Sequence, residues 1–252
     1  MSAEQCGPGL EAAFPGAVNA RDGGGLACQG GFMVTGRLFR SGSPEPAAYD
    51  ALWSKGVRTV VDLRTPGEVA IAPPPFGGTR IRREAIPIVP GNITQTLQLS
   101  LTDAPDLGIG SVGELYRLML DTNGAELAAA ISCVARGLPA GVLVHCAAGK
   151  DRTGMVVALI QMTLGVALPD VVAHYAASAA RLPAAWRDQL PEAITRHPKA
   201  ALIVELIVGS PPEAMEAAID HLEENWGGAR PYLSAQGLAP DDVRALREHL
   251  VH

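Results

Sequence analysis

The sequence predicts an α/β fold: a central, mainly parallel sheet of four to five strands flanked by helices, with extra helices toward the C-terminus. Two observations lead to this prediction. From "FMVTGRLFRSG" onward, short apolar runs alternate with helix-length segments, a pattern typical of parallel strands joined by covering helices. The chain has 252 residues and 48% hydrophobic content, which is enough for one α/β domain with its own core.

The expected strands are short apolar runs bounded by turn residues, and the chain before them lacks this pattern. Residues 1–30 are rich in Gly, Ala and Pro, as in "GPGLEAAFPG", with little periodicity. We therefore expect a loose N-terminal extension at 1–30 and a single domain at 31–252. The strands are expected at Arg37–Arg40, Val57–Arg64, Ile81–Val89 and Val142–His145.

The helices are predicted from capping residues and from apolar periodicity. Ser111 and Glu114 have capping-box spacing at the start of "SVGELYRLML". The Asn-Gly pair at 123–124 separates this helix from "AELAAAISCVAR", which stops at Gly137, and "TGMVVALIQMTLG" predicts a buried helix that ends at Gly165. Further helices are expected at Pro169–Ala180, Pro183–Thr195, Pro212–Asn225 and Asp241–Val251.

The segment "PGNITQTLQLSLTDAPDLGIG" lies between the third strand and the first of these helices. It is too polar, and too often interrupted by Gly and Pro, to belong to the core. We expect it to form either a lid or a plain loop.

The charge and the cysteines argue against several classes of protein. With 20 Lys and Arg against 26 Asp and Glu, the net charge of -6 disfavours a chain that coats nucleic acid or anionic lipid by bulk attraction. No segment approaches the roughly 18 uninterrupted apolar residues of a membrane span, and "MSAEQCGPGL" does not read as a signal peptide. We expect a cytoplasmic protein, with export by another route left open. The four cysteines show no zinc-ligand spacing, so reduced thiols and no metal are expected.

The segment "VLVHCAAGKDRTGMVV" (142–157) places five ionisable residues, a histidine, a cysteine, a lysine, an aspartate and an arginine, between two apolar runs. It lies where a strand ends and a buried helix begins, a junction at which free backbone N–H groups and the helix dipole favour an anion. These groups, together with Arg152, are expected to lower the pKa of Cys146 and to give a reactive thiolate. Arg152 can fold back over the loop and offer two parallel donors to a phosphate.

Small residues would let this loop curl around an anion. Ala147, Ala148 and Gly149 have little or no side chain, and Gly149 can adopt a positive φ without strain. The competing phosphate motif, the nucleotide-binding P-loop, requires Gly at the position of Val144 and Ser or Thr at the position of Asp151. The sequence fails both requirements.

The loop "HCAAGKDRTG" resembles the signature H-C-x5-R-[ST] of cysteine-dependent phosphatases. With "LFRSGSPE", "VRTVVDLRTPGE" and the helix that carries Tyr175, the chain resembles the bacterial tyrosine-phosphatase family, which includes dual-specificity and phosphoinositide-hydrolysing members. The resemblance covers about residues 32–180. It implies a cysteine-phosphatase-like fold, so that 31–252 would be one phosphatase domain. The Trp-Pro-Asp loop that supplies the acid in many eukaryotic tyrosine phosphatases is missing, so no general acid can be transferred from that pattern.

The resemblance implies hydrolysis of phosphotyrosine in proteins, extended to phosphoserine and phosphothreonine in dual-specificity members, with no cofactor and no metal. Cys146 would attack phosphorus, and water would later hydrolyse the phosphocysteine. Arg152 and the backbone amides of residues 147–152 would hold the phosphate oxygens. The Thr153 hydroxyl would donate to the sulfur, and His145 would orient the loop by hydrogen bonds.

Several aspartates compete to protonate the leaving oxygen. Asp62 ends an apolar strand and should emerge at the sheet edge where the Cys146 loop begins, which makes it the first candidate. Its alternative role is a structural partner for Arg64 or a helix cap. Asp151, inside the loop, comes second, and its alternative role is a brace for Lys150 or for a neighbouring strand. The remaining candidates lie on the possible lid, Asp103 and Asp106.

Lys150 bears most on the substrate. A second cation beside Arg152 could meet a second phosphate, as in a phosphoinositide, or an acidic neighbour in a phosphoprotein, or it could face solvent on the loop rim. Tyr116 and Tyr175 are expected to be core residues with satisfied hydroxyl groups. The oligomeric state is left open.

Two further classes use a comparable loop. A module that binds phosphorylated residues without turnover would keep the pocket, but loss of the cysteine or the arginine would have indicated it, and both are present. A rhodanese-type sulfur-transfer domain also places a cysteine at a strand-helix junction. The "GKDRT" half of the loop suits phosphate better than sulfur transfer.

Overall fold

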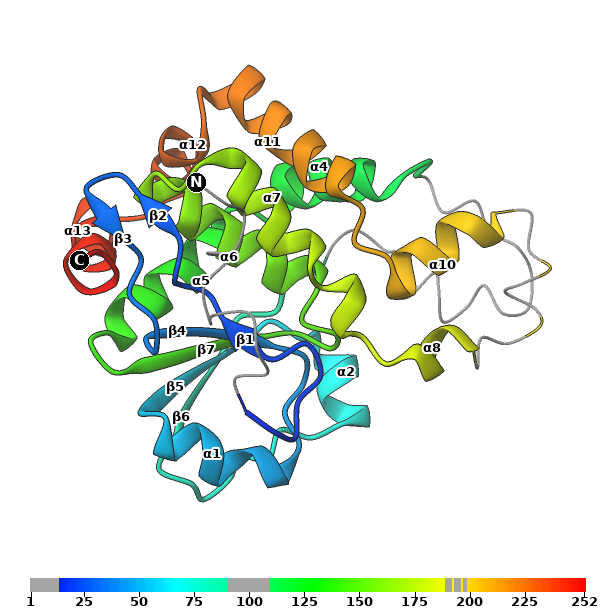
Figure 1. Ribbon diagram of the computed structural model, residues 1–252, viewed down its shortest axis with the longest axis horizontal. Helices are drawn as coiled ribbons and strands as arrows, with labels where there is room; N and C mark the ends of the chain where they lie inside the picture. The colour runs from blue at the N-terminus through cyan, green and yellow to red at the C-terminus, as the bar shows by residue number, and fades with distance from the viewer. Residues whose placement is uncertain (1–13, 90–108, 189–191, 193–195, 197–198) are drawn as a thin grey trace, which may run out of the picture.

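The computed structural model describes residues 14–89, 109–188, 192, 196 and 199–252, and it is built around a five-stranded sheet. The strands lie in the order β1-β4-β7-β5-β6 (Figure 1). The three pairings among β4, β7, β5 and β6 are parallel, and β1 is antiparallel to β4. The predicted mainly parallel α/β sheet is therefore confirmed. The strand bounds are β1 Arg21–Asp22, β4 Leu38–Ser41, β5 Val57–Asp62, β6 Arg82–Ala85 and β7 Gly141–His145.

Each face of the sheet supplies one hydrophobic core, because successive strand side chains point to opposite sides. In β7, Val142 and Val144 belong to the larger core and Leu143 to the smaller one. Helices α5 (Gly124–Gly137) and α6 (Asp151–Leu164) pack on the larger face. Helix α1 (Tyr49–Ser54) lies on the opposite side of the sheet, where Leu52 joins the smaller core (Figure 1).

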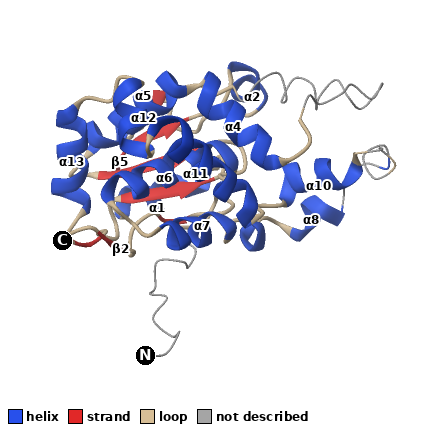
Figure 2. Ribbon diagram, turned by 90° about the horizontal axis from the view of Figure 1, so that it is seen from above, coloured by secondary structure: helices blue, strands red, loops and turns tan. Residues whose placement is uncertain are grey.

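A further group of helices covers α5 and α6. Helix α11 packs along α4, while α13 packs on α5 and α12 on α6. Two helices, α8 and α10, lie at one end of the molecule, beyond the sheet (Figure 2). The remaining helix bounds are α2 Pro66–Ile71, α4 Val112–Thr122, α7 Leu168–Ala176, α8 Ala184–Asp188, α10 Ala200–Val208, α11 Pro212–Trp226, α12 Ala229–Ala235 and α13 Pro240–Leu250, with 3-10 turns at Pro46–Ala48 and Ala179–Arg181.

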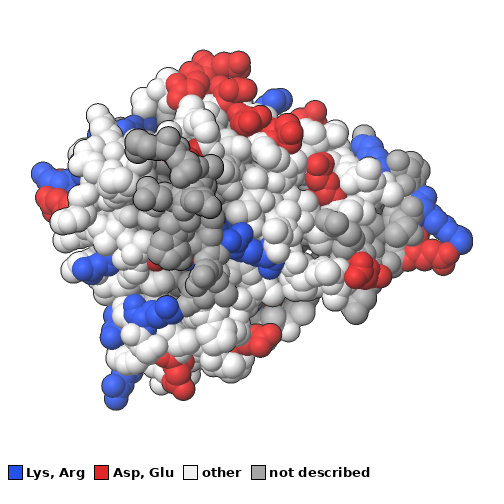
Figure 3. All heavy atoms as spheres, viewed as in Figure 1, with Lys and Arg blue, Asp and Glu red and all other residues white. Residues whose placement is uncertain are grey.

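The helix ends follow the predicted capping residues. The Ser111 side chain accepts a hydrogen bond from the Glu114 backbone N–H at 3.1 Å, and Gly165 ends α6 with a φ of 80°. The acidic residues of α11, Glu213, Glu216, Glu223 and Glu224, are exposed, and Figure 3 shows acidic side chains gathered over this helix. Helices α1, α2, α10 and α12 were not expected from periodicity. The proposed lid falls almost entirely on residues 90–108, outside the described residues.

The expectation of a loose extension over residues 1–30 is wrong from Phe14 onward. Phe14 is 3% exposed and packs edge-on against Phe39 at a centroid distance of 6.3 Å. Residues 21–22 form β1, and the pair β2 (Ala27–Cys28) and β3 (Gly31–Phe32) forms a small hairpin. The backbone N–H of Phe32 donates to the carbonyl of His252 at 2.9 Å, so this hairpin also contacts the C-terminus. Residues 1–13 lie outside the described part.

None of the helices in the described part of the chain is both long enough and apolar enough to cross a lipid bilayer.

Replacing Phe14 with Ala should lower the free energy of unfolding by about 3–5 kcal/mol, because it empties a packed aromatic site in the smaller core. Denaturant unfolding followed by circular dichroism measures this loss. Phe32→Ala, at a side chain that is 64% exposed, is the matched control and should change stability by less than about 0.5 kcal/mol. Equal small effects of the two substitutions would show that residues 14–22 are not part of the core.

Candidate active site

The loop 146–150 lies between the end of β7 at His145 and the start of α6 at Asp151, as the sequence predicts. Gly149 has a φ of 69°, and a Cβ atom there would lie 2.2 Å from the backbone carbon of Ser41. Only glycine therefore fits this position, where the loop crosses the end of β4. Cys146 is buried at 2% exposure directly after the strand.

Arg152 is held in place by Glu68. Its Nη1 and Nη2 atoms donate to the two carboxylate oxygens of Glu68 at 2.7 and 2.6 Å. Burial disfavours the charge on Arg152, but this bidentate pair more than offsets burial and raises the pKa of Arg152 above its ordinary value. Arg152 also interacts electrostatically with Cys146. A permanently charged guanidinium is thus fixed beside the thiol.

The role of Glu68 at this site was not predicted from the sequence, although its place at a helix start has a local signal. Thr65 accepts a hydrogen bond from the Glu68 backbone N–H, and the Glu68 side chain accepts one from the Thr65 N–H, a complete capping box at the start of α2. "TPGE" has the spacing of that motif. The motif predicts the helix start, but it contains no sign that the same carboxylate binds Arg152.

Asp62 occupies the strand end expected for it, but its environment is that of a structural ion pair. Arg64 donates to both carboxylate oxygens of Asp62 at 2.9 Å, and Arg83 of β6 donates to Oδ2 at 2.9 Å. Burial raises the pKa of Asp62. The hydrogen bonds from Arg64 and, in acid, the charge of His145 outweigh burial and lower this pKa from 3.8 to about 2. A group with this pKa holds no proton to donate at neutral pH. The geometry therefore favours the alternative role, a structural partner for Arg64.

His145 lies between Asp62 and the loop. Its Nδ1 is 3.2 Å from the carbonyl oxygen of Cys146, and its Nε2 is 3.6 Å from Oδ1 of Asp62. Burial lowers the pKa of His145 to about 4, against the opposing effect of Asp62, so the ring is neutral at physiological pH. A neutral ring with a proton on Nδ1 can donate to the Cys146 carbonyl. This geometry suits the expected orienting role.

Asp151 is held by a tyrosine pair. The Tyr116 hydroxyl lies 2.7 Å from Oδ1 of Asp151 and 2.8 Å from the hydroxyl of Tyr175. Since Tyr116 has one proton and a carboxylate oxygen accepts, the hydrogen-bonded chain runs from Tyr175 to Tyr116 to Asp151. The two tyrosines are buried with satisfied hydroxyl groups, as expected. The Asp151 side chain is 23% exposed, and its Oδ2 has no hydrogen-bond partner among the described residues.

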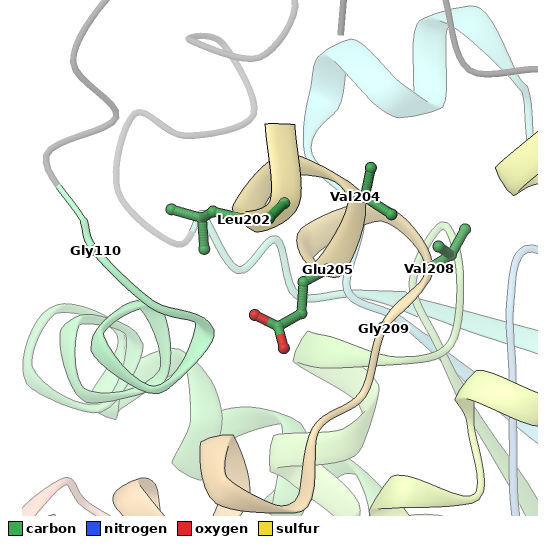
Figure 4. Close-up of a pocket in the computed structure, with 7 residues that line it drawn as sticks. Gly110, Leu202, Val204, Glu205, Val208 and Gly209 are labelled. Atoms are coloured by element: carbon green, nitrogen blue, oxygen red, sulfur yellow. The ribbon is translucent and has the colours of Figure 1, made fainter. Parts of the chain in front are cut away.

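Lys150 is neither solvent-facing nor open to a second phosphate in this structure. Its side chain is fully buried, and Nζ donates to the carbonyl oxygens of Leu206 at 2.8 Å and Glu205 at 3.2 Å. These carbonyls belong to the C-terminal turn of α10, where the helix dipole favours a cation. Nζ also lies 3.4 Å from Oδ1 of Asp151. On its other side, α10 lines a pocket of about 530 Å³ beside Gly110, into which the Glu205 side chain points (Figure 4).

The remaining predicted residues are only partly accounted for. Thr153 is buried, and its hydroxyl has no hydrogen-bond partner in the described part of the chain, so donation to the sulfur stays a prediction. Asp103 and Asp106 lie outside the described residues. Among the residues that are described, no group of three or more His, Cys, Asp or Glu side chains could hold a metal ion.

The loop brings together a buried cysteine, a position that only glycine fits and a fixed arginine, an arrangement that can hold an anion beside a thiol. Comparison with known proteins identifies the class of protein. The chain matches the model of the tyrosine phosphatase family over residues 12–252 and belongs to this family. It is a phosphatase, in agreement with the sequence prediction.

Three relatives illustrate the match. A putative tyrosine-protein phosphatase of Cupriavidus necator is 31% identical over 247 residues, which cover 94% of this chain and 87% of that protein. The triple specificity protein phosphatase PtpB of Mycobacterium tuberculosis is 28% identical, covering 93% of this chain and 96% of that protein. A tyrosine-protein phosphatase of Nostoc commune is 29% identical, covering 80% of this chain and 68% of that protein.

Replacing Asp62 with Asn should lower the free energy of unfolding by about 3–5 kcal/mol at neutral pH, because Arg64 loses its buried counter-charge. The pKa of Asp62 lies at about 2 in the folded protein, below its ordinary 3.8, so its stabilisation is complete above the ordinary value and is lost as the pH falls through about 2. Urea unfolding at a series of pH values measures both effects. The wild type and the variant should converge in acid, and a difference that stays constant with pH would contradict the ion-pair assignment.

Proposed function

We propose that this phosphatase hydrolyses phosphomonoesters, with phosphotyrosine in proteins as its main substrate, through a phosphocysteine on Cys146. One observation carries the proposal: Cys146 and Arg152 meet at one loop, and Glu68 holds Arg152 in a bidentate pair. A planar guanidinium fixed in this way presents its charge without having to reorganise during the reaction. The relatives, which are named as tyrosine-protein phosphatases and a triple specificity protein phosphatase, support the same substrate class.

The reaction balances in two displacements. The Cys146 thiolate attacks phosphorus, the bond between phosphorus and the ester oxygen breaks, and the leaving oxygen takes a proton from the general acid. Water then attacks the phosphocysteine and gives a proton to the carboxylate that acted as the acid, the bond between phosphorus and sulfur breaks, and the thiolate and inorganic phosphate are released. Arg152 and the loop N–H groups stabilise the charge on the phosphate oxygens in both steps. The Thr153 hydroxyl would ease the departure of the thiolate in the second step.

Asp151 is the general acid in this proposal, and Asp62 is a structural residue. The Tyr116 hydroxyl fixes one carboxylate oxygen of Asp151, while the other has no partner among the described residues and can carry the proton. Asp62, in contrast, has both oxygens engaged by arginines. A proton donor must be able to reach the leaving oxygen, and only the first of these carboxylates has an oxygen free to do so.

The environment of Lys150 favours a phosphoprotein over a phosphoinositide. A second phosphate on the substrate would need a nearby free cation, and the Lys150 ammonium is bound to two carbonyl oxygens of α10 with no exposed surface. Phosphoserine and phosphothreonine remain further substrates within the proposal. We also propose a cytoplasmic location, as expected from the sequence.

Cys146→Ser should reduce hydrolysis of p-nitrophenyl phosphate to below about 1% of the wild-type rate, with chelator present throughout, because an alcohol is a poor nucleophile at its native pKa. Cys133→Ser, at a second buried cysteine in α5, is the matched control and should retain activity. Release of phosphate from the wild type is measured with and without added divalent ions. Activity that requires a metal, or equal loss in both serine variants, would overturn the proposal.

Asp151→Asn should lower kcat by about 10²- to 10⁴-fold on alkyl phosphates, whose leaving groups require protonation. Activated aryl phosphates should be affected much less. Asp170→Asn, an exposed carboxylate in the first turn of α7, is the control and should leave both rates unchanged. Steady-state rates on the two substrate types test the assignment. If folded Asp62→Asn shows the leaving-group dependence and Asp151→Asn does not, Asp62 is the acid.

A further inference from the structure

The backbone carbonyl oxygens of the four consecutive residues 147–150 all accept hydrogen bonds from the protein interior. The Ser43 backbone N–H donates to the carbonyl of Ala147 at 2.9 Å. Side-chain donors take the next three carbonyls, those of Ala148, Gly149 and Lys150. In contrast, no backbone N–H of residues 147–150 donates to any other described residue.

Two side chains far away in the sequence supply these donors. The Nδ2 of Asn19 donates to the carbonyls of Gly149 at 2.8 Å and Ala148 at 3.3 Å. The Nη2 of Arg40 in β4 donates to the carbonyls of Gly149 at 2.9 Å and Lys150 at 3.3 Å. Both side chains are buried, so these contacts lie beneath the loop and not on its solvent side.

The donors themselves are fixed by further contacts. Arg21 in β1 donates to the Oδ1 and to the backbone carbonyl of Asn19, and its other Nη donates to Ser178 at 2.9 Å. Asn19 has a φ of 56°, a left-handed conformation that asparagine tolerates better than most residues. The Nη1 of Arg40 lies 3.5 Å from Nδ1 of His174. Burial lowers the pKa of His174 well below its ordinary value, so its ring is neutral and its Nδ1 can accept from Arg40.

Because each peptide unit is planar, the contacts to the loop carbonyls also determine where the loop N–H groups point. In a planar trans peptide the carbonyl of one residue and the N–H of the next point in opposite directions. Carbonyls 147–150 that are held toward the protein interior therefore turn the N–H groups of residues 148–151 the other way. The carbonyl of Lys150 also accepts from the Gly154 N–H at 2.8 Å, whereas those of Ala148 and Gly149 are bound by the two side chains. Without these donors, the two peptides that begin at Ala148 and Gly149 could rotate, and their N–H groups would lose their direction.

We propose that Asn19 and Arg40 are positioning residues for the catalytic loop: by binding the carbonyl oxygens of Ala148, Gly149 and Lys150 they aim the loop N–H groups at the phosphate. This inference rests on one part of the proposed function, namely that the loop binds a phosphate group. It assigns a role in this site to the glycine-rich N-terminal segment, which the sequence analysis treated as loose.

The charge of Arg40 strengthens the same effect. Burial lowers the pKa of Arg40 to about 10, so it stays protonated at neutral pH. Cys146, Tyr116, Tyr175 and Asp151 favour this charge electrostatically, whereas the neighbouring Arg21 opposes it. Arg40 and Arg152 thus both interact electrostatically with Cys146, and two guanidinium charges at one loop favour a bound anion.

Two pairs of variants test the proposal. Asn19→Asp keeps an oxygen for Arg21 but loses the N–H donors, and Asn19→Gly removes the side chain while tolerating the positive φ. Arg40→Lys keeps the cation but has one nitrogen in place of the two Nη atoms that contact the loop carbonyls and His174, and Arg40→Met removes the charge as well. Gln161→Met is the matched control, because buried Gln161 of α6 donates to Gly23 of the same N-terminal segment at 3.0 Å and makes no contact with the loop.

The readouts are the dissociation constant of tungstate, measured by calorimetry, the rate of Cys146 alkylation by iodoacetamide at neutral pH, and the midpoint of thermal unfolding. Both Asn19 variants should weaken tungstate binding by about 10- to 100-fold, since a displaced oxyanion site loses most of its contacts at once. Arg40→Met should lose more affinity than Arg40→Lys and should also slow alkylation. Gln161→Met should lower the unfolding midpoint and leave both loop readouts within about twofold of the wild type.

Tungstate affinity within twofold of the wild type in the folded Asn19 variants would overturn the proposal. So would a loss in Gln161→Met equal to theirs, because that would reflect stability alone. If Arg40→Met does not fold, Arg40→Lys and Asn19→Asp carry the test. A wild type that binds tungstate but hydrolyses no phosphate ester would defeat the proposed function and not the positioning role, and a wild type that binds no tungstate would overturn both.

Discussion

A loop that binds an anion through backbone N–H groups must keep those groups unpaired and aimed at one point. Buried N–H groups without partners are costly, so the surrounding structure has to hold them in place through other atoms. Here the parallel pairing of β4 with β7, with Ser41 opposite His145, brings the end of β4 directly behind the loop. Arg40 and Ser43 can bind loop carbonyls for this reason, and Gly149 is required because the two backbones cross there.

The charges around Cys146 are each assigned to a partner. Asp62 accepts hydrogen bonds from Arg64 and Arg83, and Lys150 donates to a carbonyl oxygen in the last turn of α10. Arg152 is paired with Glu68, yet a planar guanidinium with one edge bound keeps donors on its other edge. Arg40 binds neutral carbonyls and keeps its full charge. The positive potential at the loop therefore comes from two arginines whose positions are fixed before an anion arrives, which is the condition for electrostatic stabilisation at low reorganisation cost.

The parts of the site that could be predicted from the sequence are those encoded by contiguous residues. The strand-loop-helix junction, the positive φ of Gly149 and the start of α6 all follow from one segment. The role of Asp62 could not be predicted, because Arg83 reaches it only through the pairing of β5 with β6. The local sequence around Glu68 predicts its helix cap. It does not predict the ion pair with Arg152, which is 84 residues away.

The N-terminal segment was misjudged for a related physical reason. Periodicity detects elements that bury an apolar face, whereas this segment contributes few apolar side chains, with Phe14 the largest. Its other contacts are polar, from Asn19 to loop carbonyls and from Arg21 to Asn19 and Ser178. The contacts of Asn19 with the loop and of Arg21 with Ser178 join residues more than 100 positions apart, so they leave no pattern in the local sequence. A segment rich in glycine is therefore expected to lack fixed structure. In the folded protein, however, glycine permits a close backbone contact, because a Cβ atom at Gly24 would lie 2.2 Å from the carbonyl oxygen of Val34.

The two carboxylates near the loop show how environment divides roles between identical residues. Asp62 is surrounded by cations, and each ion pair favours its ionised form. At Asp151 the Tyr116 hydroxyl fixes one oxygen, and burial raises the pKa of Tyr116 well above its ordinary value, so this donor stays neutral. A neutral donor orients a carboxylate in either protonation state, whereas two arginines would hold it ionised. The Lys150 ammonium lies 3.4 Å from Oδ1 of Asp151 and also donates to two carbonyls of α10. This difference in hydrogen-bond partners is the reason that our proposal assigns proton donation to Asp151 and not to Asp62.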